Sequence, residues 1–152
     1  MRHSLLSLFV LVVSSLSAQS FRDFNYEISC VGIGQYGYYL VEVSTFVNKK
    51  KDVGHDVVKR SALHGILYKG FSATNEYPAQ KPILSSSLSA QQQDYLINLV
   101  KNQYALYTSS VDEMLKVVKV GKRYKVTAII EVNVAQLRKT LEKEGVVRKL
   151  GF

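Results

Sequence analysis

The alternation of apolar and polar residues predicts two β-hairpins, one in each half of the chain. Residues 24–30 alternate with a period of two, and residues 38–47 do the same after a glycine-rich break. The connection between these segments is short, which predicts an antiparallel hairpin. Residues 114–120 and 124–134 flank a short loop that contains glycine, and they predict a second hairpin. The last of these segments has the clearest alternation in the chain.

A different pattern, with apolar residues at spacings of three and four, predicts a helix over residues 57–67. Asp56 falls in its first turn, where the helix dipole favours an anion. Gly70 follows the last periodic residue and is expected to adopt the left-handed conformation of a C-terminal cap. One side of this helix carries only small residues, Ser61, Ala62 and Gly65, which should let it lie close to a sheet.

Two further helices are predicted from signals at their ends. Residues 89–92 spell Ser-Ala-Gln-Gln, a capping box, and the helix that they begin is expected to end within residues 107–110. Asn133 can cap a last helix, with Gly145 beyond its other end. The connection at residues 71–87 holds both prolines and a serine run, which predicts a long surface loop.

Together these elements have the order β-β-α-α-β-β-α. The order predicts an α+β fold, with an antiparallel or mixed sheet of about four strands and helices packed on one face. The chain has 152 residues with an ordinary apolar content of 47%, which favours a single domain. We expect that domain to comprise residues 21–152.

Residues 1–20 have the pattern of a secretory signal peptide. Arg2 supplies a basic start, residues 5–13 form an apolar run, and residues 18–20 fit a cleavage site before Phe21. The apolar run is too short for a membrane-spanning helix. We therefore expect export to the periplasm or cell surface, without a lipid anchor at the cleavage site because no cysteine follows the run. The single cysteine, Cys30, excludes an internal disulfide and is expected to be a small buried residue.

Residues 32–37 spell Gly-Ile-Gly-Gln-Tyr-Gly, which matches the glycine pattern of dinucleotide-binding sites. Such a site needs a helix directly after the glycines, because the helix N-terminus holds the pyrophosphate. Here residues 38–47 are rich in aromatic and β-branched side chains and predict a strand. We interpret the glycines as a hairpin turn or bulge and expect no cofactor.

Candidate catalytic and metal-binding residues are few. His55 and His64 are not spaced to share one helical face as a metal pair would, so no metal site is expected. Glu27 and Glu42 could face each other across the first hairpin, which leaves a hydrolase of envelope polymer, using these carboxylates or His55, as an alternative. Solvated strand carboxylates are far commoner than a catalytic pair, and we expect the protein not to be an enzyme.

The formal net charge is +8, with basic clusters at residues 49–51, 116–125 and 138–149. On an exported protein this charge would meet an acidic partner or an anionic membrane or glycan rather than nucleic acid, although plain solvated faces have the same composition. Tyrosine, with an apolar body and a polar tip, suits interfaces. The candidate interaction surface therefore combines the tyrosines of the first hairpin with the basic loop of the second: Tyr36, Tyr38, Tyr39, Lys122 and Arg123.

The strand, the basic turn, the helix containing A-L-H-G-I-L-Y-K-G-F and the ending V-V-R-K-L-G-F support a resemblance over nearly all of residues 21–152. The chain resembles uncharacterised secreted envelope proteins of Bacteroides-type bacteria. More distantly, it is similar to the N-terminal module of the flagellar assembly T protein and to related outer-membrane lipoprotein domains. The resemblance implies a periplasmic or surface adaptor that binds an envelope protein, and it carries no catalytic residue. The missing lipid-attachment cysteine departs from the lipoprotein members.

Overall fold

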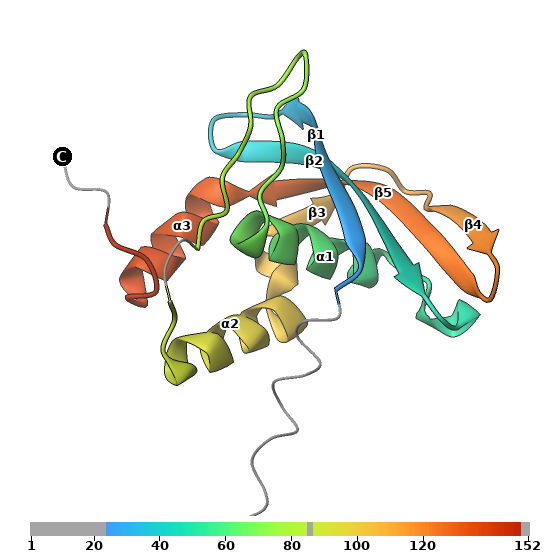
Figure 1. Ribbon diagram of the computed structural model, residues 1–152. Helices are drawn as coiled ribbons and strands as arrows, with labels where there is room; N and C mark the ends of the chain where they lie inside the picture. Colours follow the sequence, from blue (N-terminus) through green and yellow to red (C-terminus); the bar gives the residue numbers. More distant parts are fainter. Residues whose placement is uncertain (1–23, 85–86, 150–152) are drawn as a thin grey trace, which may run out of the picture.

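Five antiparallel strands form the sheet on which the fold is built. The computed structural model describes residues 24–84 and 87–149. The sheet has the order β1-β2-β5-β3, and β4 pairs with the same edge of β5 as β3 does (Figure 1). The strands are β1 (Tyr26–Ile33), β2 (Tyr38–Val47), β3 (Thr108–Ser110), β4 (Lys116–Val120) and β5 (Arg123–Asn133). The helices are α1 (His55–Tyr68), α2 (Ala90–Asn102) and α3 (Val134–Lys143), with 3-10 turns η1 (Lys50–Asp52) and η2 (Tyr104–Leu106).

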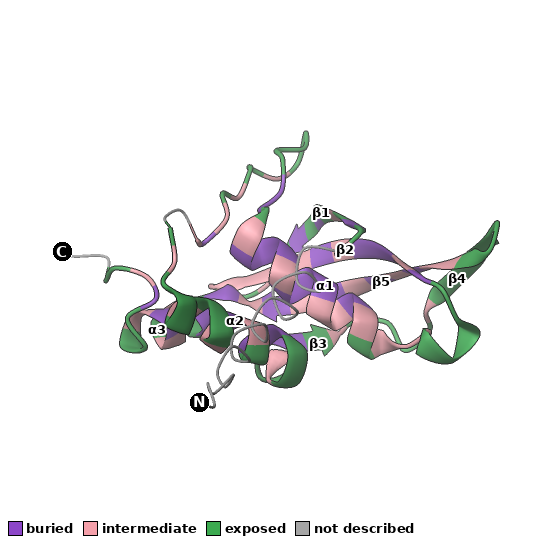
Figure 2. Cartoon of the chain, turned by 60° about the horizontal axis from the view of Figure 1, so that its bottom comes forward, coloured by how far each residue is buried: buried purple, intermediate pink, exposed green. Residues whose placement is uncertain are grey.

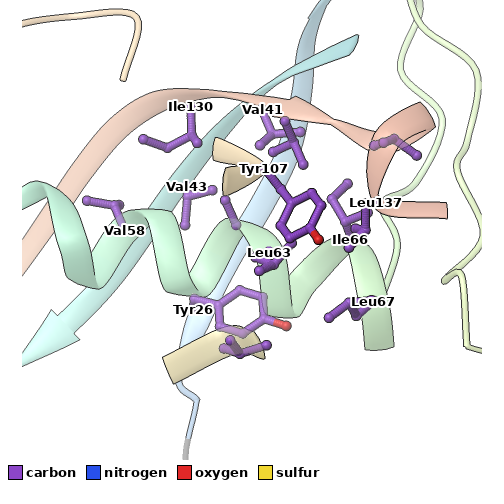
Figure 3. Close-up of a cluster of buried hydrophobic side chains, with 14 of the residues drawn as sticks. Tyr26, Val41, Val43, Val58, Leu63, Ile66, Leu67, Tyr107, Ile130 and Leu137 are labelled. Atoms are coloured by element: carbon purple, nitrogen blue, oxygen red, sulfur yellow. The ribbon is translucent and has the colours of Figure 1, made fainter. Parts of the chain in front are cut away.

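One face of the sheet carries the core. Along β5 every second side chain is buried, from Val126 to Val132, and α1 packs across this face against β1, β2, β3 and β5. Figure 3 shows Ile130 of β5, Val43 of β2 and Val58 of α1 in the same part of the core. Figure 1 shows α2 on the side of α1 away from the sheet. The predicted α+β fold, with helices on one face of an antiparallel sheet, is confirmed.

The close approach of α1 to the sheet depends on its small residues, as the sequence predicted. A Cβ added to Gly65 would lie 2.8 Å from Cδ1 of Ile28 and 3.2 Å from the ring of Tyr26. Ser61 is fully buried, and its hydroxyl donates to the Val57 carbonyl at 2.8 Å, so its polar atom has a partner within the helix. The helix can therefore lie directly on β1 while the buried Ser61 hydroxyl keeps a hydrogen-bond partner.

The predicted helix caps are present. Ser89 and Gln92 make both hydrogen bonds of a capping box at the start of α2. Asn133 Oδ1 accepts from the Gln136 backbone N–H at 2.9 Å and caps α3. Beyond the C-terminal ends of α1 and α3, Gly70 has φ +65° and Gly145 has φ +69°. These local signals set the helix boundaries as short-range hydrogen bonding predicts.

The predicted end of the second helix was wrong. α2 ends at Asn102, and the following residues form η2 and then β3, whose Thr108 lies opposite Val132 of β5. Tyr107 turns into the core, where it is buried among apolar side chains (Figure 3). Burial of this ring and pairing with the free edge of β5 outweigh the helix that the local pattern favours, so the sheet gains a short fifth strand.

The long connection after α1 is anchored at both of its described ends. Phe71 and Gln80 pair across a narrow lobe, which projects beyond the sheet in Figure 1. The backbone N–H groups of Ile83 and Leu84 then donate to carbonyls in the last turns of α1, at 3.2 and 3.0 Å. The predicted surface loop is therefore tied to the helix that it follows. The predicted signal peptide and its cleavage site lie outside the described residues.

The glycine motif forms the turn between β1 and β2. Gly37 has φ +88°, and the chain continues directly into β2 rather than into a helix. The pairing register shifts between Cys30 and Gly32, which marks a β-bulge at Val31. Both parts of the predicted turn or bulge are thus present, and the Cys30 side chain is buried as expected.

Candidate functional site

The β4–β5 hairpin extends past the part of the sheet that α1 covers. Its two-residue turn places Val120 opposite Arg123, and Gly121 has the positive φ, +60°, that such a tight turn requires. All five residues of β4 are exposed, as the green segment in Figure 2 shows. In the described part of the chain, β4 pairs only with β5, so its other edge faces solvent.

Apolar side chains crowd this exposed strand and the connection that leads into it. Met114 is 84% exposed and Val118 is 58% exposed. Five of the nine large hydrophobic residues that the described chain exposes fall within ten consecutive positions: Val111, Met114, Val117, Val118 and Val120. Apolar side chains scattered singly are normal, but a contiguous group on an open strand edge marks an interaction surface. We call residues 111–120 the β4 edge.

The charges around the β4 edge are positive and only partly neutralised. Lys125 Nζ lies 3.3 Å from Glu27 Oε2, and the Arg123 guanidinium lies 4.7 Å from the centre of the Phe46 ring. Across residues 24–84 and 87–149 the Lys125–Glu27 contact is the single ion pair. Lys116, Lys119 and Lys122 therefore have no described carboxylate within ion-pair distance. Their charges remain available to a partner: Lys116, Lys119 and Lys122 are all exposed.

A shallow hollow of about 430 Å³ adjoins the start of β4 on the sheet face opposite α1. Glu42, Thr127 and Ile129 supply part of its wall from β2 and β5. The β3–β4 connection, residues 112–115, supplies the rest together with Lys116. Carboxylates and a lysine thus share one hollow with the exposed Met114 side chain, so the candidate surface extends from the strand edge onto the open sheet face.

The predicted interaction residues fall at two opposite ends of the sheet. Tyr36 is fully exposed in the β1–β2 turn. Lys122 lies in the β4–β5 turn and Arg123 begins β5, at the other end of β2 and β5. The ten residues of β2 separate the two turns by roughly 30 Å at about 3.3 Å per residue. The five residues therefore do not form one continuous surface.

Two of the three predicted tyrosines have structural contacts. The Tyr38 hydroxyl accepts a hydrogen bond of 2.7 Å from Asn133 Nδ2, the side chain that also caps α3. The Tyr39 ring packs edge-on against Phe71, with 5.8 Å between the ring centres, and joins β2 to the loop after α1. Among these tyrosines, Tyr36 is the one that stands wholly in solvent.

The residues considered for hydrolysis do not all line the hollow beside β4. Glu27 pairs with Lys125, and Glu42 lies on the next strand one diagonal position away. Glu42 lines the hollow beside β4, whereas neither Glu27 nor His55 does. His55 begins α1, and its Nε2 lies 3.3 Å from the Asp112 carbonyl oxygen. Of the three side chains that a catalytic pocket would gather, the hollow beside β4 therefore holds only Glu42.

The pKa values of His64 and Tyr26 are shifted by burial where α1 packs on β1. The His64 ring stacks between Phe24 and Tyr68, at 4.4 and 4.6 Å between ring centres, and its Nδ1 lies 2.8 Å from the Tyr26 hydroxyl. Burial lowers the pKa of His64 to about 4 and raises the pKa of Tyr26. The tyrosine keeps its proton and the imidazole is neutral, so the two groups share a hydrogen bond whose donor is set by the histidine tautomer. His64 is thus the satisfied packing histidine that the sequence suggested.

The β4 edge was missed from the sequence, although one signal was present. Residues 116–120 read Lys-Val-Val-Lys-Val, in which two valines are adjacent and the apolar side chains do not alternate. A strand with one buried face should alternate, as β5 does. The departure from alternation sets this strand apart from β5, which buries one face.

Comparison of the chain with protein-family models, with curated proteins and with solved structures finds no match. The resemblance to secreted envelope proteins therefore stays a prediction. In the part of the chain that the structure describes, no helix combines the length and apolar content needed to cross a bilayer. Within the same residues, no three histidine, cysteine or acidic side chains gather closely enough to hold a metal ion.

Proposed function

We propose that this chain is an exported, non-enzymatic binding module of the cell envelope that holds a protein partner through the β4 edge. One observation carries the proposal: β4 is apolar, exposed on both faces and open along one edge. Natural sheets usually protect such an edge, and lysines at the edge are one means of doing so. The exposed valines of β4 are consistent with an edge that binds another molecule.

The location in the cell envelope rests on the signal-like pattern of residues 1–20. The non-enzymatic part of the proposal is supported by the ion pair of Glu27 with Lys125 and by the position of Glu27 and His55 outside the hollow that Glu42 lines. An adaptor needs a rigid scaffold and an accessible surface, and the α1-covered core supplies the first while the β4 edge supplies the second.

Site-specific photo-crosslinking in the native host tests the proposal. A photoreactive side chain at Val118 should capture the same envelope protein in repeated experiments, because this position is exposed on the β4 edge. The matched control places the group at Lys139, an exposed position on α3. Capture of one protein from Val118 and not from Lys139 would support the proposal. Equal capture from both positions, or none from Val118, would refute it.

The clustering of exposed lysines in and next to β4, at Lys116, Lys119 and Lys122, favours a second candidate function, peripheral binding to an anionic glycan or lipid surface. Charge reversal at Lys122 and Arg123 should then abolish retention on anionic vesicles, whereas reversal at Lys139 and Lys143 on α3 should not. Equal effects of the two double variants would show that net charge alone is responsible.

A further inference from the structure

We infer that the β4 edge binds an extended acidic segment of its partner by strand addition. This inference rests on the proposed binding function and specifies the chemistry of the partner. Strand addition joins backbone groups of an incoming segment to the free edge of a sheet, and side chains at alternate positions give the selectivity. The β4 edge offers both: an unpaired backbone and a defined order of side chains.

The pairing register identifies the free backbone groups. Val120 and Arg123 flank the two-residue turn, and in such hairpins the flanking residues exchange both backbone hydrogen bonds. Bonded and non-bonded pairs then alternate along β4 and β5. The N–H and C=O groups of Val117 and Lys119 therefore point away from β5, toward the side on which the described chain provides no strand.

The side chains define what the incoming strand should carry. Successive side chains of a strand point to opposite faces, so Lys116 and Val118 share one face while Val117 and Lys119 share the other. Within residues 116–119, each face thus presents one cation and one apolar side chain. Opposite charges and apolar pairs stabilise directly facing positions of neighbouring strands. The complement is a segment in which two apolar residues lie between two acidic residues.

Charge argues against a second copy of this chain as the occupant. Lys116, Lys119, Lys122, Arg123 and Lys125 give residues 116–125 five cations, and this stretch contains no acidic residue. Pairing β4 with β4 would bring these like charges together, which destabilises facing positions. An anionic membrane would satisfy the cations but would leave the edge N–H and C=O groups of Val117 and Lys119 without strand partners. The combination of free backbone, valines and lysines favours an acidic extended peptide.

The test uses two synthetic peptides with the purified protein, followed by NMR of its backbone amides. One peptide has the core Glu-Val-Val-Glu, and the other has the core Lys-Val-Val-Lys, which repeats the sequence of β4. The acidic peptide should shift the amide signals of β4 and slow hydrogen exchange at Val117 and Lys119, whose N–H groups are free. It should bind at least about tenfold more tightly than the basic peptide.

Charge reversal supplies the matched control. The double variant Lys116→Glu and Lys119→Glu should reverse the preference, so that the basic peptide binds more tightly than the acidic one. Both positions are exposed, and the variant should keep the fold. The double variant Lys139→Glu and Lys143→Glu makes the same change in net charge on α3 and should keep the original preference.

Several results would overturn the inference. These are equal binding of the two peptides, tighter binding to anionic phospholipid vesicles than to the acidic peptide, and concentration-dependent dimers of the protein alone. Binding of the acidic peptide without slower exchange at Val117 and Lys119 would exclude strand addition. Crosslinking of a protein partner from Val118 together with no peptide binding would leave the proposed function intact and refute only the strand-addition mode.

Discussion

Replacement of Gly70 by alanine tests how the long connection is held against α1. Gly70 has φ +65°, and an added Cβ would overlap the carbonyl oxygen of Gln80 and lie 2.9 Å from the Lys81 carbonyl carbon. These are backbone atoms and cannot rotate away as a side chain can. The segment from Gln80 onward must therefore move when the methyl group is added.

The expected cost has three parts. The left-handed conformation costs an alanine about 1 kcal/mol. Displacement of the segment breaks the hydrogen bonds from the N–H groups of Ile83 and Leu84 to the end of α1, at about 1 kcal/mol each. Exposure of the buried Ile83 side chain adds about 1 kcal/mol or more. Gly70→Ala should therefore lower the free energy of unfolding by about 4 kcal/mol.

Gly145 provides a matched control, because it also follows a helix, has φ +69° and has no atom within 4 Å of an added Cβ. Gly145→Ala should cost only the conformational term, about 1 kcal/mol. Urea denaturation monitored by circular dichroism measures the free energy of unfolding of both variants. The comparison requires that the slope of this free energy against urea concentration is the same for all variants. Equal losses of stability in the two variants would refute the argument that the Gln80 backbone blocks a side chain at Gly70.

Three further predictions concern pH, the core and export. Burial lowers the pKa of His64 from 6.5 to about 4, so between these values the unfolded chain binds a proton that the folded chain does not. The free energy of unfolding should fall as the pH drops through this window, by about 1–2 kcal/mol after allowance for the partial exposure of the ring. Urea midpoints at the two ends of the window measure this fall, and an unchanged pH dependence in His64→Gln would contradict it. Leu63→Ala should cost about 2–5 kcal/mol in thermal or urea unfolding because Leu63 is fully buried, whereas Leu106→Ala, at an exposed position, should cost less than about 0.5 kcal/mol. The intact mass of the exported protein should correspond to a chain that starts at Phe21, and a mass that includes residues 1–20 would disprove the predicted cleavage.

The sequence by itself determined the features that depend on near neighbours. Alternation over residues 124–134 identified β5 and the face that it buries, because side chains of a strand point to opposite sides at every step. The capping box at Ser89 and the cap at Asn133 placed the helix starts, since these hydrogen bonds span only three residues. The strand after the glycine motif likewise excluded a dinucleotide site, because β2 begins at Tyr38 where such a site needs a helix.

Only the tertiary structure decided what each element contacts. β3 exists because the free edge of β5 accepts Thr108 while Tyr107 is buried, and neither condition is local. β4 is exposed on both faces because α1 covers the sheet only up to the base of the β4–β5 hairpin, which no pattern within residues 116–120 specifies. Likewise, the antiparallel register of β2 and β5 places Tyr36 and Lys122 at opposite ends of the sheet. Composition can identify residues suited to binding, but the distance between them depends on how the strands pair.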